Sequence, residues 1–74
     1  MNPPNPNYTI RGFFVIGDVS KCLHIQYLLG RGNIDFIIKD DGDITRFLFK
    51  TGADVGRAYA ILESNGIVVD RDLI

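Results

Sequence analysis

Hydrophobic and polar positions along the chain predict six elements in the order βαββαβ. Runs rich in β-branched and aromatic residues predict strands, and these runs cover residues 9–16, 34–39, 44–50 and 67–69. Helices are predicted over residues 19–29 and from Thr51 to the Asn65-Gly66 pair. Glycine-containing turns separate the elements, which is typical of one small domain that mixes helices with strands.

Both predicted helices are preceded by residues that suit a helix N-terminus. Asp18 can accept a hydrogen bond from the free backbone N–H groups of the first helix. Thr51 and Asp54 have the Thr-x-x-Asp spacing with which a hydroxyl and a carboxylate satisfy the first amides of the second helix. The second helix carries one apolar stripe, predicted to pack on a sheet, at Val55, Ala58, Tyr59 and Leu62.

The first helix has more apolar residues than one buried face requires. One ridge, predicted to face the sheet, is formed by Cys22, Ile25 and Leu29. Leu23 and Tyr27 form a second ridge, and Leu28 lies further round the helix. Two interpretations remain open. Either the domain wraps this helix more deeply, or the second ridge contacts another chain.

The two halves of the chain echo each other. A shift of 33 residues superposes Phe14 on Phe47 and Leu29 on Leu62, so each half is one βαβ unit. Right-handed crossovers place both helices on one side of a four-stranded antiparallel sheet and leave the other side uncovered. The predicted fold is therefore α+β, of the ferredoxin-like βαββαβ type.

Residues 1–7 differ in composition from the rest of the chain. They hold all three prolines, which remove backbone donors and favour an extended, unpacked arm. The folded domain is predicted to cover residues 8–74. Apolar runs fall far short of the roughly 20 residues that span a bilayer, and no basic-then-apolar leader is seen, so we expect an intracellular protein, cytoplasmic or nuclear, without membrane contact.

Charge and cysteine content argue against several classes of binding site. Eight Lys and Arg against nine Asp and Glu give a net charge of −1, so no basic field draws nucleic acid from a distance. The densest charge cluster, Asp40-Asp41-Gly42-Asp43, is interpreted as a solvated turn, because it lacks the remaining ligands of a calcium loop. One Cys and one His cannot build a disulfide or a zinc site, and no cofactor or metal is expected.

Catalysis is not expected. Cys22 and His24 are two positions apart on a predicted helix, so their side chains point about 200° apart and cannot act as a pair. Cys22 is interpreted as a core residue and His24 as a solvated one.

Several short segments carry a family resemblance. Arg46-Phe47-Leu48-Phe49, the alanine-containing stretch 54–62 and Asn65-Gly66 follow one another, and Phe14-Val15-Ile16-Gly17-Asp18-Val19 and Gly32-Asn33-Ile34 precede them. Together, over residues 13–74, they resemble an RNA-recognition motif domain. The resemblance implies a βαββαβ fold whose two central strands present aromatic residues to stack on RNA bases.

The chain departs from that pattern where the family stacks bases. If Phe47 and Phe49 point inward, the stacking positions fall on Val15, Ile44 and Arg46, none of them aromatic. A change of register by one residue would instead expose both phenylalanines. The preferred register predicts an apolar open face made by Phe13, Val15, Ile44 and Leu48, which suits a protein partner better than RNA.

A second family fits the same order of elements. The passages 30–34 and 65–68 also look like the helix-to-strand passages of ACT domains, which pair side by side and bind small ligands such as amino acids between subunits. The loop before the first helix offers only Gly17-Asp18 where that family has a Pro-Gly pair. An ACT-like regulatory domain is therefore the alternative.

The leading hypothesis is a divergent RNA-recognition-motif-like module that acts mainly through protein–protein interaction. It is expected to be a homodimer or a subunit of a heteromeric RNA-processing or ribonucleoprotein complex, with weak or auxiliary contact to single-stranded RNA. Candidate interface residues are Leu23, Tyr27 and Leu28 on the first helix, and Phe13, Val15 and Leu48 on the sheet. Candidate RNA phosphate contacts are Lys39, Arg46 and Lys50.

Overall fold

The computed structural model describes residues 8–72, so the predicted arm, residues 1–7, lies outside the described range, as do residues 73–74. Four strands and two helices alternate in the predicted order. Their bounds are β1 Ile10–Ile16, α1 Val19–Arg31, β2 Ile37–Asp41, β3 Ile44–Phe49, α2 Gly52–Ser64 and β4 Asp70–Arg71.

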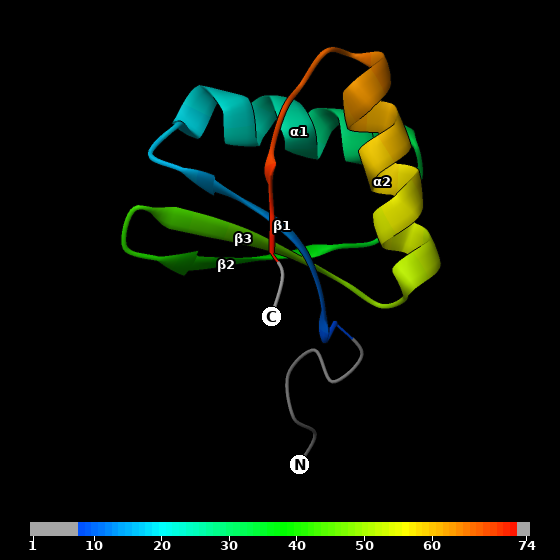
Figure 1. Ribbon diagram of the computed structural model, residues 1–74, viewed down its shortest axis with the longest axis horizontal. Coiled ribbons are helices and arrows are strands. Elements are labelled where there is room, and N and C mark those ends of the chain that lie inside the picture. The colour runs from blue at the N-terminus through cyan, green and yellow to red at the C-terminus, as the bar shows by residue number, and fades with distance from the viewer. Residues whose placement is uncertain (1–7, 73–74) are drawn as a thin grey trace.

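One antiparallel sheet holds the four strands in the order β2-β3-β1-β4, and both helices cover the same side of it (Figure 1). This arrangement confirms the α+β, ferredoxin-like fold predicted from the sequence. β1 and β3 lie at the centre of the sheet, whereas β2 and β4 are its edges. The side of the sheet opposite the helices is called the open face below.

Side-chain caps begin both helices as predicted. The Asp18 carboxylate accepts from the backbone N–H of Lys21 at 3.0 Å, and the Thr51 hydroxyl accepts from that of Asp54 at 3.1 Å. The Asp54 carboxylate accepts from Arg57 Nη1 at 3.4 Å, and no hydrogen bond from the Thr51 N–H to it is found in residues 8–72.

Two strands begin three residues later than predicted, and both shifts have one cause. After α1, Asn33 adopts φ 56° and the N–H of Ile34 donates to the carbonyl of Leu29. After α2, Gly66 adopts φ 70° and the N–H of Ile67 donates to the carbonyl of Leu62. These are Schellman endings, in which the apolar residue after the left-handed one packs back on the helix. The first apolar residues of both predicted strands therefore close helices instead of starting β2 and β4.

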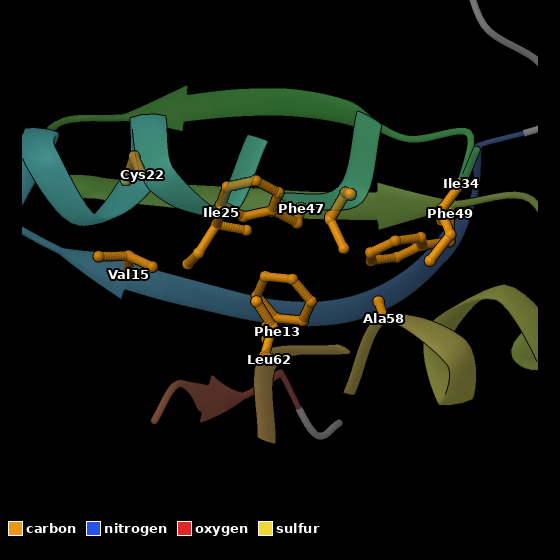
Figure 2. Close-up of a cluster of buried hydrophobic side chains, with 10 residues drawn as sticks. Phe13, Val15, Cys22, Ile25, Ile34, Phe47, Phe49, Ala58 and Leu62 are labelled. Carbon is orange, nitrogen blue, oxygen red and sulfur yellow. The ribbon is translucent and has the colours of Figure 1, made fainter. Parts of the chain in front are cut away.

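The core lies between the sheet and the two helices (Figure 2). Phe13 sits at its centre, with its ring stacked on Phe47 at 4.8 Å between centroids and tilted towards Phe49 at 5.6 Å. The fully buried helix residues that meet these rings are Ile25, Leu29, Ala58 and Leu62. Burial of each large side chain contributes about 1.5–3 kcal/mol.

The prediction that Phe13 and Val15 lie on the open face was wrong. Both are buried, with 0% and 4% of their surface exposed, on the same side as Phe47 and Phe49. The register between β1 and β3 shifts between Arg11 and Phe13, so a bulge at Gly12 interrupts the alternation of the strand. Beyond the bulge the odd positions of β1 point into the core, and Phe14 and Ile16 point away from it.

Candidate functional site

The open face is the side of the sheet that neither helix covers (Figure 1). Because Phe47 and Phe49 are buried, alternation along β3 places Ile44, Arg46 and Leu48 on the open face. The strand register adds their neighbours on β1 and β2, which are Arg11, Phe14, Ile16, Ile37, Lys39 and Asp41. The face therefore combines apolar residues with charged ones, which lie in the row through Arg46 and at both ends.

On β1, the residue that points to the open face differs from the one predicted. Ile44 and Arg46 point outward as predicted, and Leu48 is half-buried on the same face. Phe14 takes the outward position that the sequence assigned to Val15, and it lies opposite Arg46. A half-buried aromatic residue therefore lies at the β1 position where the RNA-recognition-motif resemblance would stack a base, and for which the sequence predicted a non-aromatic residue.

Arg46 is held by two carboxylates. Its Nη1 donates to Asp41 Oδ2 at 3.0 Å, and its Nε lies 3.5 Å from Asp72 Oδ2. The Asp72 side chain is only 9% exposed, and within residues 8–72 its Oδ2 atom has no hydrogen-bond partner. Two carboxylates of the fold thus neutralise the positive charge of Arg46. The same charge stabilises the Asp72 carboxylate, which is almost fully buried.

Lys50 also has partners within the fold. Its ammonium donates to Asp35 Oδ2 at 3.3 Å and lies 5.2 Å from the centre of the Tyr8 ring. The hydrogen bond with Asp35, followed by the charge of the Tyr8 side chain, raises the pKa of Lys50 above its usual value. Lys39 differs, because no ion pair to it is found in residues 8–72. Two of the three predicted phosphate contacts are therefore engaged by anions of the fold.

The outer side of α1 matches the prediction at two of three residues. Leu23 and Tyr27 are 60% and 61% exposed, and the guanidinium of Arg31 lies 5.7 Å from the Tyr27 ring centre. Leu28 is instead half-buried and packs against the core, so less of its side chain is exposed to another chain than that of Leu23 or Tyr27. Deeper wrapping of the helix accounts for Leu28, whereas Leu23 and Tyr27 remain available to another molecule.

A groove of about 560 Å³ lies between α1 and the β2–β3 hairpin. Its apolar lining includes Val19, Leu23 and Ile38, and its rim carries three carboxylates, Asp18, Asp40 and Asp43. The N-terminal end of α1 and the hairpin turn lie at the same end of the molecule (Figure 1), and the Gly17 N–H donates to the carbonyl of Asp43 at 2.8 Å.

Sequence reasoning did not find this groove. Its walls come from segments about 20 residues apart, and their approach depends on how α1 crosses the sheet. The signal available was the acidic run 40–43, interpreted as one solvated turn. In the structure only Gly42 and Asp43 form the turn, while Asp40 and Asp41 belong to β2 and point to opposite faces of the sheet.

Cys22 and His24, the remaining candidates for chemistry, do not lie together, although Cys22 also lines the groove. Cys22 is 7% exposed in the core and His24 is exposed on α1, as the sequence predicted. Among residues 8–72 no three His, Cys, Asp or Glu side chains are grouped so as to hold a metal ion. No helix in that part of the chain is long and apolar enough to cross a bilayer.

Comparison of the chain with protein-family models, curated proteins and solved structures finds no significant match. The functional argument therefore rests on the surfaces described above.

Proposed function

We propose that this domain is a protein-interaction module that dimerises through the open face of its sheet. It would act as a structural unit of a larger assembly, in line with the RNA-recognition-motif-like role in a ribonucleoprotein or RNA-processing complex expected from the sequence. RNA contact is auxiliary in this proposal. The observation that carries it is the pairing of Arg46 with two carboxylates at the centre of the sheet face, among apolar side chains of β1, β2 and β3.

The apolar side chains of the open face favour a protein partner. Ile16 is 58% exposed, and Phe14, Ile37, Ile44 and Leu48 are half-buried beside it. Contiguous exposed apolar surface on a small domain is typical of interaction sites, because its removal from water favours association by about 25 cal/mol per Å².

The charges of the open face suit a second copy of the same chain. Lys39, Arg46, Phe14 and Asp70 form one row across the sheet, with a cation at the β2 edge and an anion at the β4 edge. A two-fold axis parallel to the strands reverses this row in the second copy. Lys39 of each copy then lies over Asp70 of the other, Ile16 lies over Ile44, and Arg46 lies over the Phe14 ring, so the row pairs cation with anion at its ends and cation with aromatic ring at its centre.

The same charges disfavour RNA as the main ligand. A phosphate at Arg46 would compete with Asp41 and Asp72, and a phosphate at Lys50 would compete with Asp35. Phe14 offers one ring for base stacking, worth about 1–3 kcal/mol. We therefore expect weak, salt-sensitive RNA binding in which Lys39 takes part.

The ACT-like alternative is less well supported. The groove beside the Gly17-Asp18 loop is the place where such a ligand would sit, but its lining includes three carboxylates and no Lys or Arg in the part of the chain described. The ammonium of a free amino acid would pair with these carboxylates, but its own carboxylate would find no Lys or Arg in the groove and would meet like charges. Stabilisation by free amino acids in a thermal-shift screen would favour this alternative over ours.

Solution mass, measured by light scattering over a range of concentrations, tests the proposal. The wild type is expected to be a dimer, and Ile16→Glu a folded monomer, because the new charge would lie against Ile44 of the second copy. The matched control is Leu23→Asp with Tyr27→Asp, which adds acidic groups to α1 at similarly exposed sites and is expected to stay dimeric.

Either of two results would contradict the proposal. A monomeric wild type removes the homodimer, and a monomeric α1 variant beside a dimeric Ile16→Glu moves the interface to α1. Circular dichroism of each variant shows whether it is folded. Titration with oligouridine in low and high salt then measures how much RNA contributes.

A further inference from the structure

We propose that the groove between α1 and the β2–β3 hairpin binds an extended peptide, which adds as a strand to the edge of β2 and places a lysine or arginine beside Asp40. This site lies on the helix-covered side of the sheet, away from the open face, and does not depend on the dimer. Two separate features carry the proposal: the hydrogen-bonding edge of β2 and the charge of the groove.

β2 has one side without a strand partner in the part of the chain that is described, because it is the outermost strand of the sheet. The two-residue turn at Gly42-Asp43 closes on the pair Asp41 and Ile44, which is a hydrogen-bonded pair in such hairpins. Hydrogen-bonded and non-bonded pairs alternate along an antiparallel ladder, so Ile38 and Asp40 direct their backbone N–H and C=O groups away from β3. An incoming strand can pair with these groups.

The side chains of the same two residues face the groove. Ile38 and Asp40 lie opposite Phe47 and Thr45, which are on the inner side of the sheet, and both line the groove. The hydroxyl of Thr45 donates to Asp40 Oδ1 at 3.2 Å, which fixes the carboxylate on that side. Residues of an added strand opposite Ile38 and Asp40 would therefore point their side chains into the groove.

The charge of the groove selects the peptide. Asp18, Asp40 and Asp43 line it, and no Lys or Arg does so within residues 8–72. Val19 and Leu23, which are 76% and 60% exposed, offer apolar contacts above the β2 edge. The complementary ligand has a basic residue opposite Asp40 and, two positions later in the antiparallel direction, an apolar residue opposite Ile38.

A peptide of sequence Thr-Lys-Thr-Val-Thr-Val, acetylated and amidated at its ends, is the probe. Titrated into isotopically labelled full-length chain, it is expected to shift the NMR amide signals of Ile38 and Asp40 and to slow their hydrogen exchange. Signals of Val19 and Leu23 should move with them, while those of Phe14 and Ile16 on the open face stay in place.

Matched controls separate the backbone from the charge. N-methylation of the probe at Lys and at the following Val removes the donors that face β2 and should abolish binding. Two changes of charge should each weaken binding at least about two- to five-fold: Glu in place of Lys in the probe, and Asp40→Asn in the protein. Asp41→Asn, one position along β2 but on the open face, should leave the affinity unchanged.

Several results would overturn the proposal. These are no amide shifts at the highest soluble peptide concentration, equal binding of the N-methylated probe, or equal effects of Asp40→Asn and Asp41→Asn. A change in solution mass caused by Asp40→Asn would mean that a second copy, and not a peptide, occupies the edge. Ile16→Glu keeps the groove intact, so loss of the dimer and loss of peptide binding are distinguishable.

Discussion

At the scale of single residues, the bulge at Gly12 determines which side of β1 is buried. A Cβ atom at this position would meet the ring carbons Cε1 and Cδ1 of Phe49, the second at 2.8 Å. The Gly12 carbonyl also accepts from the Tyr59 hydroxyl and from the N–H of Asp72. The bulge is therefore held from one side by the core and from the other by α2 and the segment after β4.

We expect Gly12→Ala to destabilise the domain by about 1–3 kcal/mol, because the buried ring of Phe49 has to move. Chemical denaturation followed by circular dichroism measures the change. Gly56→Ala in α2 is the control, since its Cβ meets nothing within 4 Å and alanine favours helix by about 0.5–1 kcal/mol. Equal effects of the two substitutions would contradict this account of the bulge.

Arg46 gives a second expectation at this scale. Arg46→Ala leaves Asp72 Oδ2, a buried atom, without its cation and should cost about 1–3 kcal/mol. Adding Asp72→Asn should recover part of the loss, as measured by the same denaturation. Lys39→Ala, its neighbour on β2, should change the stability by less than about 0.5 kcal/mol. An Arg46→Ala variant as stable as Lys39→Ala would show that the pair is not needed.

At the scale of elements, the two helices were predictable because their signals are local. Asp18 and Thr51 cap them, and the stripe through Ala58 and Leu62 faces the core as predicted. The strands were less predictable. The Schellman endings take Ile34 and Ile67 away from β2 and β4, and the bulge at Gly12 depends on the fit of Phe49, a residue far along the chain.

The sequence similarity between the two halves of the chain also predicts the helices better than the strands. Leu29 and Leu62 correspond under the shift of 33 residues, and both are fully buried in the core. Phe14 and Phe47 correspond under the same shift but lie on opposite faces of the sheet. The helical correspondence follows from local periodicity, whereas the strand correspondence depends on tertiary register.

The cap of α2 can be tested by one substitution. Thr51→Ala removes the acceptor for the Asp54 N–H and should cost about 1 kcal/mol. Thr51→Ser keeps a hydroxyl at the same place and should restore most of the stability. Thermal unfolding of the three proteins checks this order, and a Thr51→Ser variant no better than Thr51→Ala would mean that the methyl group, and not the cap, matters.

At the scale of the whole molecule, Tyr59 joins α2 to the sheet. Its hydroxyl donates to the Gly12 carbonyl at 2.5 Å, and the Arg71 guanidinium of β4 lies 4.6 Å from its ring centre. Burial raises the pKa of Tyr59 above its usual value, and this outweighs the opposing charge of Arg71. The hydroxyl therefore keeps its proton, and the hydrogen bond, throughout the neutral range.

This predicts how stability depends on pH. A folded pKa raised above the unfolded one stabilises the domain below about pH 10, and this contribution is lost as the pH rises through the folded pKa. The raised pKa of Lys50 acts in the same direction, so the comparison is with Tyr59→Phe. At neutral pH, the Tyr59→Phe variant should be less stable than the wild type by about 0.5–1.5 kcal/mol. Above pH ~10, the stability of the variant should fall less than that of the wild type. Parallel pH curves would exclude Tyr59 as the group responsible.

β4 has consequences for how the molecule opens. Within residues 8–72 it pairs with β1 at Phe13–Arg71 and Phe14–Asp70, whereas β3 pairs along β1 from Ile10 to Ile16. Free energies of local opening follow the number of contacts that must be broken. Amide hydrogen exchange should therefore be fastest in β4 and slowest in the β1–β3 ladder. Two similar βαβ halves thus form a domain of unequal cooperativity, in which one outer edge opens long before the central ladder does.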